Sequence, residues 1–223
     1  MSDRQQVIPG EVITNQALRL ESNVQFHGND IISTITGYSE IADSGVRVLP
    51  LTGKYMPNID DLIVGKVVSH TSLSWEVDIN SCYSGVLPAQ DVFGRDYNAH
   101  ADELNVKLAK GDMIAARIVN FDRTRDPLIT VADRDLGKID SGLLVPITSG
   151  KIPKLIGRSG SMIQLIEDIT KSVLTVGQNG LIVVSNDDSV GLLKAVKAVE
   201  MVNKEAHIAN LTDRVEKMLK SSD

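Results

Sequence analysis

Apolar and polar residues alternate over short stretches in the first 136 residues, and the spacing becomes helical in the last third of the chain. Within residues 1–56, turn residues separate short β-like stretches, which is typical of strands joined by tight turns. The expected strands are Val12–Ile13, Asp30–Thr36 and Val46–Leu51. This pattern predicts a small N-terminal β module whose low apolar content favours packing on another surface.

Residues 57–136 contain five further stretches with the alternation of half-buried strands. They are Leu62–Ser69, Trp75–Ile79, Gly85–Ala89, Met113–Phe121 and Leu128–Val131. A long polar insert lies between the third and the fourth. Five short strands with such an insert predict a five-stranded OB-type barrel. Gly65 inside the first strand fits a place where a small barrel bends sharply.

Residues 137–223 combine both periodicities. A strand is expected at Leu143–Ile147, a helical turn at Lys151–Ile156 and a helix at Ser161–Thr170. Two strands follow, Val173–Val176 and Leu181–Ser185, and the turn Gly177-Gln178-Asn179-Gly180 joins them. Asp187 or Ser189 is expected to cap the helix that follows, and a short C-terminal helix is expected to begin at Thr212 or Asp213. The resulting order is βααββα with an added C-terminal helix.

Composition and charge limit the class of protein. The 223 residues carry 23 basic and 29 acidic side chains, a formal charge of −6. Residues 57–136 hold 8 basic and 13 acidic side chains, whereas residues 137–223 hold 11 and 10. The positive charge needed for phosphate contacts is therefore local to the C-terminal third. One cysteine excludes an internal disulfide, and the absence of a signal pattern or a bilayer-length apolar run favours a cytoplasmic protein without a membrane segment.

The stretch Ile156-Gly157-Arg158-Ser159-Gly160-Ser161-Met162-Ile163 carries the strongest candidate chemistry. Two glycines let the backbone between two helices approach a phosphodiester chain, and the following helix N-terminus offers N–H groups to phosphates. Taken alone, a Gly-x-x-Gly turn can equally well just join two packed helices. Within the βααββα order, the stretch resembles the I-G-x-x-G-x-x-I signature of KH domains, which implies a type I KH domain that binds single-stranded RNA.

The barrel resembles an S1 domain through Ile63–Val67, Val77–Ile79 and Gly85–Pro88. S1 domains usually present aromatic residues and a histidine for base stacking, but here those positions hold Leu73, Glu76 and Pro88. We therefore expect weak, non-specific RNA contact through other side chains. Two roles are possible for Trp75: its ring packs within the protein or against a subunit, or it stacks on an RNA base.

No pattern of residues indicates catalysis or a resident metal or cofactor. The four histidines have no partner at metal-ligand spacing, and no Ser/His/Asp or Cys/His set is apparent. The acidic pairs Asp60-Asp61 and Asp187-Asp188 lie beside the start of an expected strand or helix, so a turn or a cap explains them. The sequence therefore favours a non-enzymatic binding protein.

Taken together, the parts and their order are similar to the family of KH-bearing cap subunits of the archaeal exosome. The resemblance extends over nearly the whole chain and includes Val7–Glu11, Val46–Leu51, Gly157–Ile163, Val176–Ile182 and Leu211–Val215. It implies an N-terminal domain (1–56) that docks on a hexameric ring of RNase PH-like subunits, an S1 domain (57–136) at the entry pore and a KH domain (137–223). It further implies a trimeric cap, single-stranded RNA with adenine-rich tails as ligand, and phosphorolysis confined to the ring.

The leading hypothesis is an RNA-capturing cap that feeds 3′ ends to the ring, and the alternative is an assembly scaffold with incidental RNA contact. The candidate RNA-binding residues in the KH region are Lys151, Lys154, Ile156, Gly157, Arg158, Ser159 and Gly160. In the barrel they are Lys66, His70, Arg95, Arg117, Arg123 and Arg125.

Overall fold

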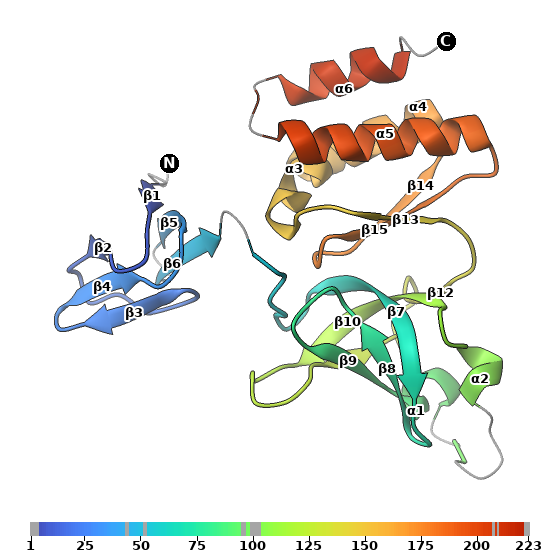
Figure 1. Cartoon of the computed structure of the whole chain (residues 1–223), viewed down its shortest axis with the longest axis horizontal. Helices are drawn as coiled ribbons and strands as arrows, with labels where there is room; N and C mark the ends of the chain where they lie inside the picture. Colours follow the sequence, from blue (N-terminus) through green and yellow to red (C-terminus); the bar gives the residue numbers. More distant parts are fainter. Residues whose placement is uncertain are drawn as a thin grey trace. The chain divides into compact units, whose positions relative to one another are not determined.

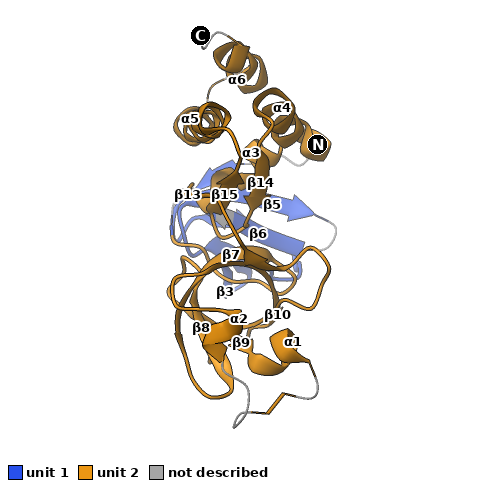
Figure 2. Cartoon of the chain, turned by 90° about the vertical axis from the view of Figure 1, so that its right-hand side faces the viewer, with its two compact units in different colours: residues 1–53 blue, residues 54–223 orange. Residues whose placement is uncertain are grey.

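The structure is a computed structural model that describes residues 5–42, 45–50, 53–94, 97–98, 104–206, 208 and 210–220. The chain divides into two compact units, residues 1–53 and residues 54–223, which Figure 2 shows in different colours. Each unit is described by itself below.

Unit 1 consists of two three-stranded antiparallel sheets. The first has the order β1 (Gln5–Val7), β5 (Gly37–Ala42), β6 (Gly45–Pro50), and the second has the order β2 (Val12–Thr14), β4 (Asp30–Ser33), β3 (Val24–His27). The three expected strands correspond to β2, β4 and β6, whereas β1, β3 and β5 were not expected, because their short runs mix polar residues with the apolar ones. Val7, Ile31, Val46 and Val48 are buried and form a small core.

The first half of unit 2 is a closed barrel, as the sequence predicts. Its strands are β7 (Leu62–His70), β8 (Ser74–Asp78), β9 (Ser84–Pro88), β10 (Met113–Asn120) and β11 (Leu128–Thr130). They are hydrogen-bonded in the order β11-β9-β8-β7-β10, and a β10–β11 pairing closes the ring (Figure 1). The insert between β9 and β10 contains α1 (Ala89–Phe93) and α2 (Leu104–Lys107), and β12 (Gly137–Ile139) extends the sheet beside β10. This arrangement is OB-like.

Two residues explain how the barrel is filled and bent. Trp75 is fully buried, stacks on Phe93 with ring centroids 6.2 Å apart, and donates its indole N–H to the Leu108 carbonyl at 3.0 Å. The structure therefore assigns Trp75 to the core and removes it from the base-stacking candidates. A Cβ atom at Gly65 would lie 2.4 Å from a methyl group of Val77, so β7 crosses β8 too closely for any side chain there.

The second half of unit 2 has the predicted β-α-α-β-β-α order and forms what we call the α/β domain. Its elements are β13 (Leu143–Pro146), η1 (Ser149–Lys151), α3 (Ile152–Ile156), η2 (Arg158–Gly160), α4 (Ser161–Thr170), β14 (Val173–Val176), β15 (Leu181–Ser185), α5 (Ser189–Glu205) and α6 (Leu211–Lys220). The sheet order is β13-β15-β14. The helices lie on one face of this sheet (Figure 1), where their apolar side chains form the domain's core.

The cap of α5 and the start of α6 each differ by one residue from the sequence prediction. The N-cap of α5 is Asp188, whose carboxylate accepts hydrogen bonds from the N–H groups of Val190 and Gly191. The expected caps, Asp187 or Ser189, were both wrong. Residues 187–189 are all of types that can cap a helix, and the backbone conformation determines which of them does so. The C-terminal helix α6 begins at Leu211, one residue before the expected start.

The barrel and the α/β domain share a small apolar cluster. Val64 of β7 packs with Leu181 and Val183 of β15, and Met113, Ile139 and Leu144 surround them. The other face of the β13-β15-β14 sheet thus rests on the barrel, which explains why both lie in one unit. Within the described ranges, no helix combines the length and the apolar character needed to cross a bilayer.

Candidate nucleic-acid interface

The connection between α3 and α4 has a conformation that few residue types adopt. Gly157 has φ 74° and ψ −178°, and Gly160 has φ 82° and ψ 5°. Ser159 between them has φ 52°. Positive φ is easily reached by glycine and costs an L-residue about 1–2 kcal/mol. The loop is therefore held in a turn that brings its backbone to the surface between the two helices.

The two glycines are required for different reasons. A Cβ atom at Gly157 would lie 2.8 Å from the backbone nitrogen of Met162, so any side chain there collides with the start of α4. A Cβ atom at Gly160 would have only Gln164 Nε2 within 4 Å, at 3.8 Å. Gly157 therefore allows the turn to close, whereas Gly160 leaves open space above the loop for another molecule's backbone.

The N-terminus of α4 is electrostatically suited to an anion. Gly160 is its N-cap residue and supplies no side-chain acceptor, and the first turn of the helix contains no acidic residue. The ten-residue helix thus presents the positive end of its dipole beside the loop. This is the arrangement in which backbone N–H groups commonly bind phosphate.

The charged side chains around the loop divide into two groups. Lys154 and Arg158 are exposed, and no carboxylate among the described residues forms an ion pair with either. Lys151 is half-buried, and its ammonium group donates a hydrogen bond to the Asn203 carbonyl in α5. Of the three predicted cations, two are available to a ligand and one is engaged within the fold. Ile156 is half-buried and packs against the domain's core.

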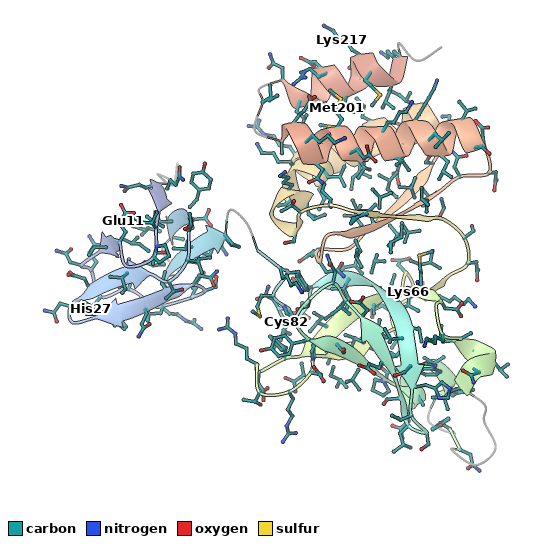
Figure 3. All side chains as sticks on the ribbon, viewed as in Figure 1. Glu11, His27, Lys66, Cys82, Met201 and Lys217 are labelled. Carbon is teal, nitrogen blue, oxygen red and sulfur yellow. The ribbon has the colours of Figure 1, made fainter. Side chains whose placement is uncertain are left out.

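The barrel candidates are dispersed over two strands and a loop. Lys66 and His70 are exposed on β7 (Figure 3 labels Lys66), and Arg123 and Arg125 are exposed in the β10–β11 loop. The guanidinium group of Arg117 contacts the Asp133 carboxylate and the Asp60 carbonyl, each at 3.0 Å. Arg95 lies outside the described residues. Of the barrel candidates that the structure describes, Arg123 and Arg125 share one loop, whereas Lys66 and His70 lie on β7 and Arg117 lies on β10.

Arg125 lines a hollow of about 450 Å³. Its walls are Val86, Asn120, Phe121, Asp122, Arg125, Asp126 and Leu128. The hydroxyl and the backbone N–H of Thr124, and then the Arg125 charge, lower the pKa of Asp122, so its carboxylate is ionised at neutral pH. Three of the seven walls are apolar, namely Val86, Phe121 and Leu128, and the carboxylates of Asp122 and Asp126 lie with the Arg125 guanidinium group among the other four. The sequence did not indicate Phe121 or Asp122, because only the barrel's closure brings the loop to Val86 of β9.

The outer face of β8 and β9 is acidic and presents no aromatic side chain from these two strands. Glu76 is exposed and accepts a hydrogen bond from the Ser69 hydroxyl at 2.7 Å. This bond, followed by one from Ser84, lowers the pKa of Glu76. Leu73 is 66% exposed but aliphatic. A fixed negative charge repels phosphate, so this face cannot hold RNA in the way a row of aromatic rings does.

Comparison with known proteins places the chain in a family. No protein-family model matches the chain. The chain is 64% identical to the exosome complex component Rrp4 of Nitrosopumilus maritimus over 216 aligned residues. These residues make up 97% of this chain and 96% of the relative. It is 43% identical to the Rrp4 of Thermofilum pendens, with 98% and 94% covered.

A crystal structure of a proposed exosome complex RNA-binding protein has the same fold over three quarters of the chain. It superposes with a TM-score of 0.71 and 37% sequence identity, covering 75% of this chain and 96% of the other. At these levels of identity and coverage, the relationship extends beyond the fold to the family. The chain belongs to the Rrp4 family of exosome complex components.

Proposed function

We propose that this chain is a non-catalytic cap subunit of an archaeal exosome, which captures single-stranded RNA and passes its 3′ end to a phosphorolytic ring. The observation that carries the proposal is the open Gly157–Gly160 loop at the N-terminus of α4, which contains the exposed Arg158 and follows the exposed Lys154. The α/β domain is then a type I KH domain, and the barrel is an S1 domain of the OB class. The names of the relatives support exosome membership.

In this proposal the loop binds the RNA backbone. The open space above Gly160 admits a phosphodiester chain, and the N-terminal turn of α4 provides N–H donors to its phosphates. Lys154, just before the loop, and Arg158, within it, add positive charge. A site of this size holds about four nucleotides, as is usual for a Gly-x-x-Gly loop between two helices.

The barrel acts as a weaker guide. Arg123 and Arg125 attract the strand toward the hollow, where Phe121 offers an apolar wall for a nucleobase. Lys66 and His70 supply further contacts at the exposed part of β7. Lys151 and Arg117 support the fold around the two surfaces, because their charged groups already have protein partners. Glu76 keeps the RNA affinity of the outer face of β8 and β9 low. The barrel therefore guides the RNA strand without binding it tightly.

The proposal extends to the partners of the chain. Unit 1 docks on a hexameric ring of RNase PH-like subunits, and three caps surround the entry pore in the cytoplasm. Ile8, Val12 and Phe26 of unit 1 are 58%, 53% and 50% exposed, so unit 1 has apolar side chains available to a partner. The RNA has an adenine-rich tail, and the phosphorolytic chemistry belongs to the ring, so this chain needs no cofactor.

A scaffold role is the second candidate. The formal charge of −6 and the Glu76 carboxylate on the barrel face favour it. In that case the chain organises the complex, and RNA contact is incidental.

The two functions differ in their response to salt. The purified chain, alone and mixed with its ring, is titrated with labelled 20-nucleotide single-stranded RNA at two salt concentrations. An RNA-capturing cap binds RNA more weakly at high salt, because counterions compete for its cationic groups, and it binds more tightly on the ring. A stable complex with the ring that binds no RNA at either salt concentration supports the scaffold instead.

A further inference from the structure

The turn between β14 and β15 lies against the barrel. Strand β7 pairs with β10 from Leu62 to Lys66, but its pairing with β8 begins only at Lys66. The second edge of residues 62–65 is therefore left open by the barrel itself. The Gly177–Gly180 turn of the α/β domain covers this edge.

Asn179 replaces the missing strand neighbour. Its Oδ1 accepts the Val64 N–H at 3.2 Å, and its Nδ2 donates to the carbonyls of Val64 and Ile79 at 2.6 and 2.9 Å. The side chain is completely buried, and both amide hydrogens have acceptors. A buried amide satisfied in this way stabilises one relative placement of the two domains, because separating them leaves polar groups unpaired.

Two backbone contacts extend this connection. The Gln178 N–H donates to the Leu62 carbonyl at 2.8 Å, and Asn80 Nδ2 donates to the Asn179 carbonyl at 3.0 Å. A Cβ atom at Gly177 would lie 2.6 Å from the Val64 nitrogen, so only glycine allows this approach. We call the contacts of residues 177–179 with β7 and Asn80 the hairpin clasp.

We infer that Asn179 is a positioning residue for RNA binding: through the hairpin clasp it holds the Gly157–Gly160 loop and the barrel's arginine-flanked hollow in one body, so that a single RNA strand engages both at a set spacing. This inference rests on the proposed function. The loop is tied to the clasp because α4 leads directly into β14, whose C-terminal end enters the turn.

The physical gain is an effective concentration. Once the loop has bound one segment of a strand, the barrel meets the next segment as an intramolecular partner. The gain is largest when the two surfaces keep a separation that the strand can span, and it falls when the domains move freely. A barrel face with weak intrinsic affinity therefore adds to the affinity for long RNA only while the clasp is closed.

The experiment compares a 5-nucleotide and a 20-nucleotide single-stranded oligoadenylate on the full-length chain. The variants Asn179→Ala and Gly177→Ala open the clasp by removing the amide and by adding a colliding Cβ atom. Gln178→Ala is the matched control, because Gln178 is exposed and contacts β7 through its backbone N–H alone. Hydrogen exchange at the Val64 amide reports whether the clasp has opened.

We expect both clasp variants to bind the short RNA as the unaltered chain does, and to bind the long RNA at least about ten-fold more weakly. Gln178→Ala should match the unaltered chain with both RNAs. If either variant fails to fold, Asn80→Gly removes a single clasp bond and suits the left-handed φ of 56° at that position. It should give a smaller loss in the same direction.

Two results would overturn the inference. One is unchanged affinity for the long RNA while the Val64 amide exchanges freely, which means that the surfaces need no set spacing. The other is an equal loss for both RNAs, which means that Asn179 serves folding alone. An unaltered chain that binds neither RNA instead refutes the proposed function, and so the two failures are distinguishable.

Discussion

The Lys151 ammonium group donates to the backbone carbonyl of Asn203, and the Asn203 side chain accepts the Thr148 N–H at 3.3 Å. The segment that enters α3 is thus tied to the last turn of α5. Three residues further along the chain, Lys154 is exposed and forms no ion pair within the described part of the chain. Two lysines beside the same loop therefore have separate roles.

Substitution of these lysines should separate binding from stability. Lys154→Ala should weaken single-stranded RNA binding about three- to ten-fold and reduce the salt slope by about one, as expected for one lost phosphate contact. Lys151→Ala should lower the free energy of unfolding by about 1–2 kcal/mol, because a charged hydrogen bond is lost. RNA titration at several salt concentrations and urea unfolding measure the two effects. Equal effects of both variants on RNA would contradict the division.

The open space at Gly160 predicts which substitution removes RNA binding without unfolding the domain. Gly160→Asp places a negative charge where phosphate would lie, and Gly160→Asn has almost the same size and backbone cost without the charge. We expect Gly160→Asp to reduce affinity at least about ten-fold and Gly160→Asn to reduce it much less. Both should unfold at similar urea concentrations. Unchanged RNA affinity in a well-folded Gly160→Asp variant would refute the assignment of the loop.

Trp75, the single tryptophan of the chain, should report on the barrel core and not on RNA. Its fluorescence should be resistant to acrylamide quenching and unchanged when RNA is added, because the ring is buried against Phe93. Trp75→Phe should destabilise the barrel by about 1–3 kcal/mol, since the Leu108 carbonyl loses its buried partner. RNA-dependent quenching of Trp75 would instead indicate direct stacking.

Acid should weaken the link between Asp112 and β12. The Lys138 ammonium group, and then the Ala109 N–H, lower the pKa of Asp112 in the folded chain. A carboxylate with a lowered folded pKa stabilises the fold above its unfolded pKa, near 4, and this contribution is lost as pH falls through the folded value. Asp112→Asn should therefore be less stable at pH 7, with the difference vanishing near pH 2. A constant difference in urea midpoint at both pH values would rule this out.

The periodicity of apolar residues determined much of the fold from the sequence alone. The five barrel strands, the βααββα order and the Gly-x-x-Gly loop were all predicted, because strand and helix spacing, turn residues and glycine pairs are local properties of the chain. Strands β1, β3 and β5 of unit 1 escaped prediction, because their runs of three to six residues with mixed polarity carry little periodic signal. The same limit applied to the cap of α5, where three neighbouring residues were equally suitable.

The roles of individual polar residues were decided only by the tertiary structure. Asn179 reads as an ordinary turn residue, yet it completes the hydrogen bonding of a strand edge 115 residues away in the sequence. Lys151 and Arg117 read as available cations, yet folding gives each a protein partner. The type of a residue determines which bonds it can form, but the partner that it meets depends on which distant segments the fold brings within about 3 Å.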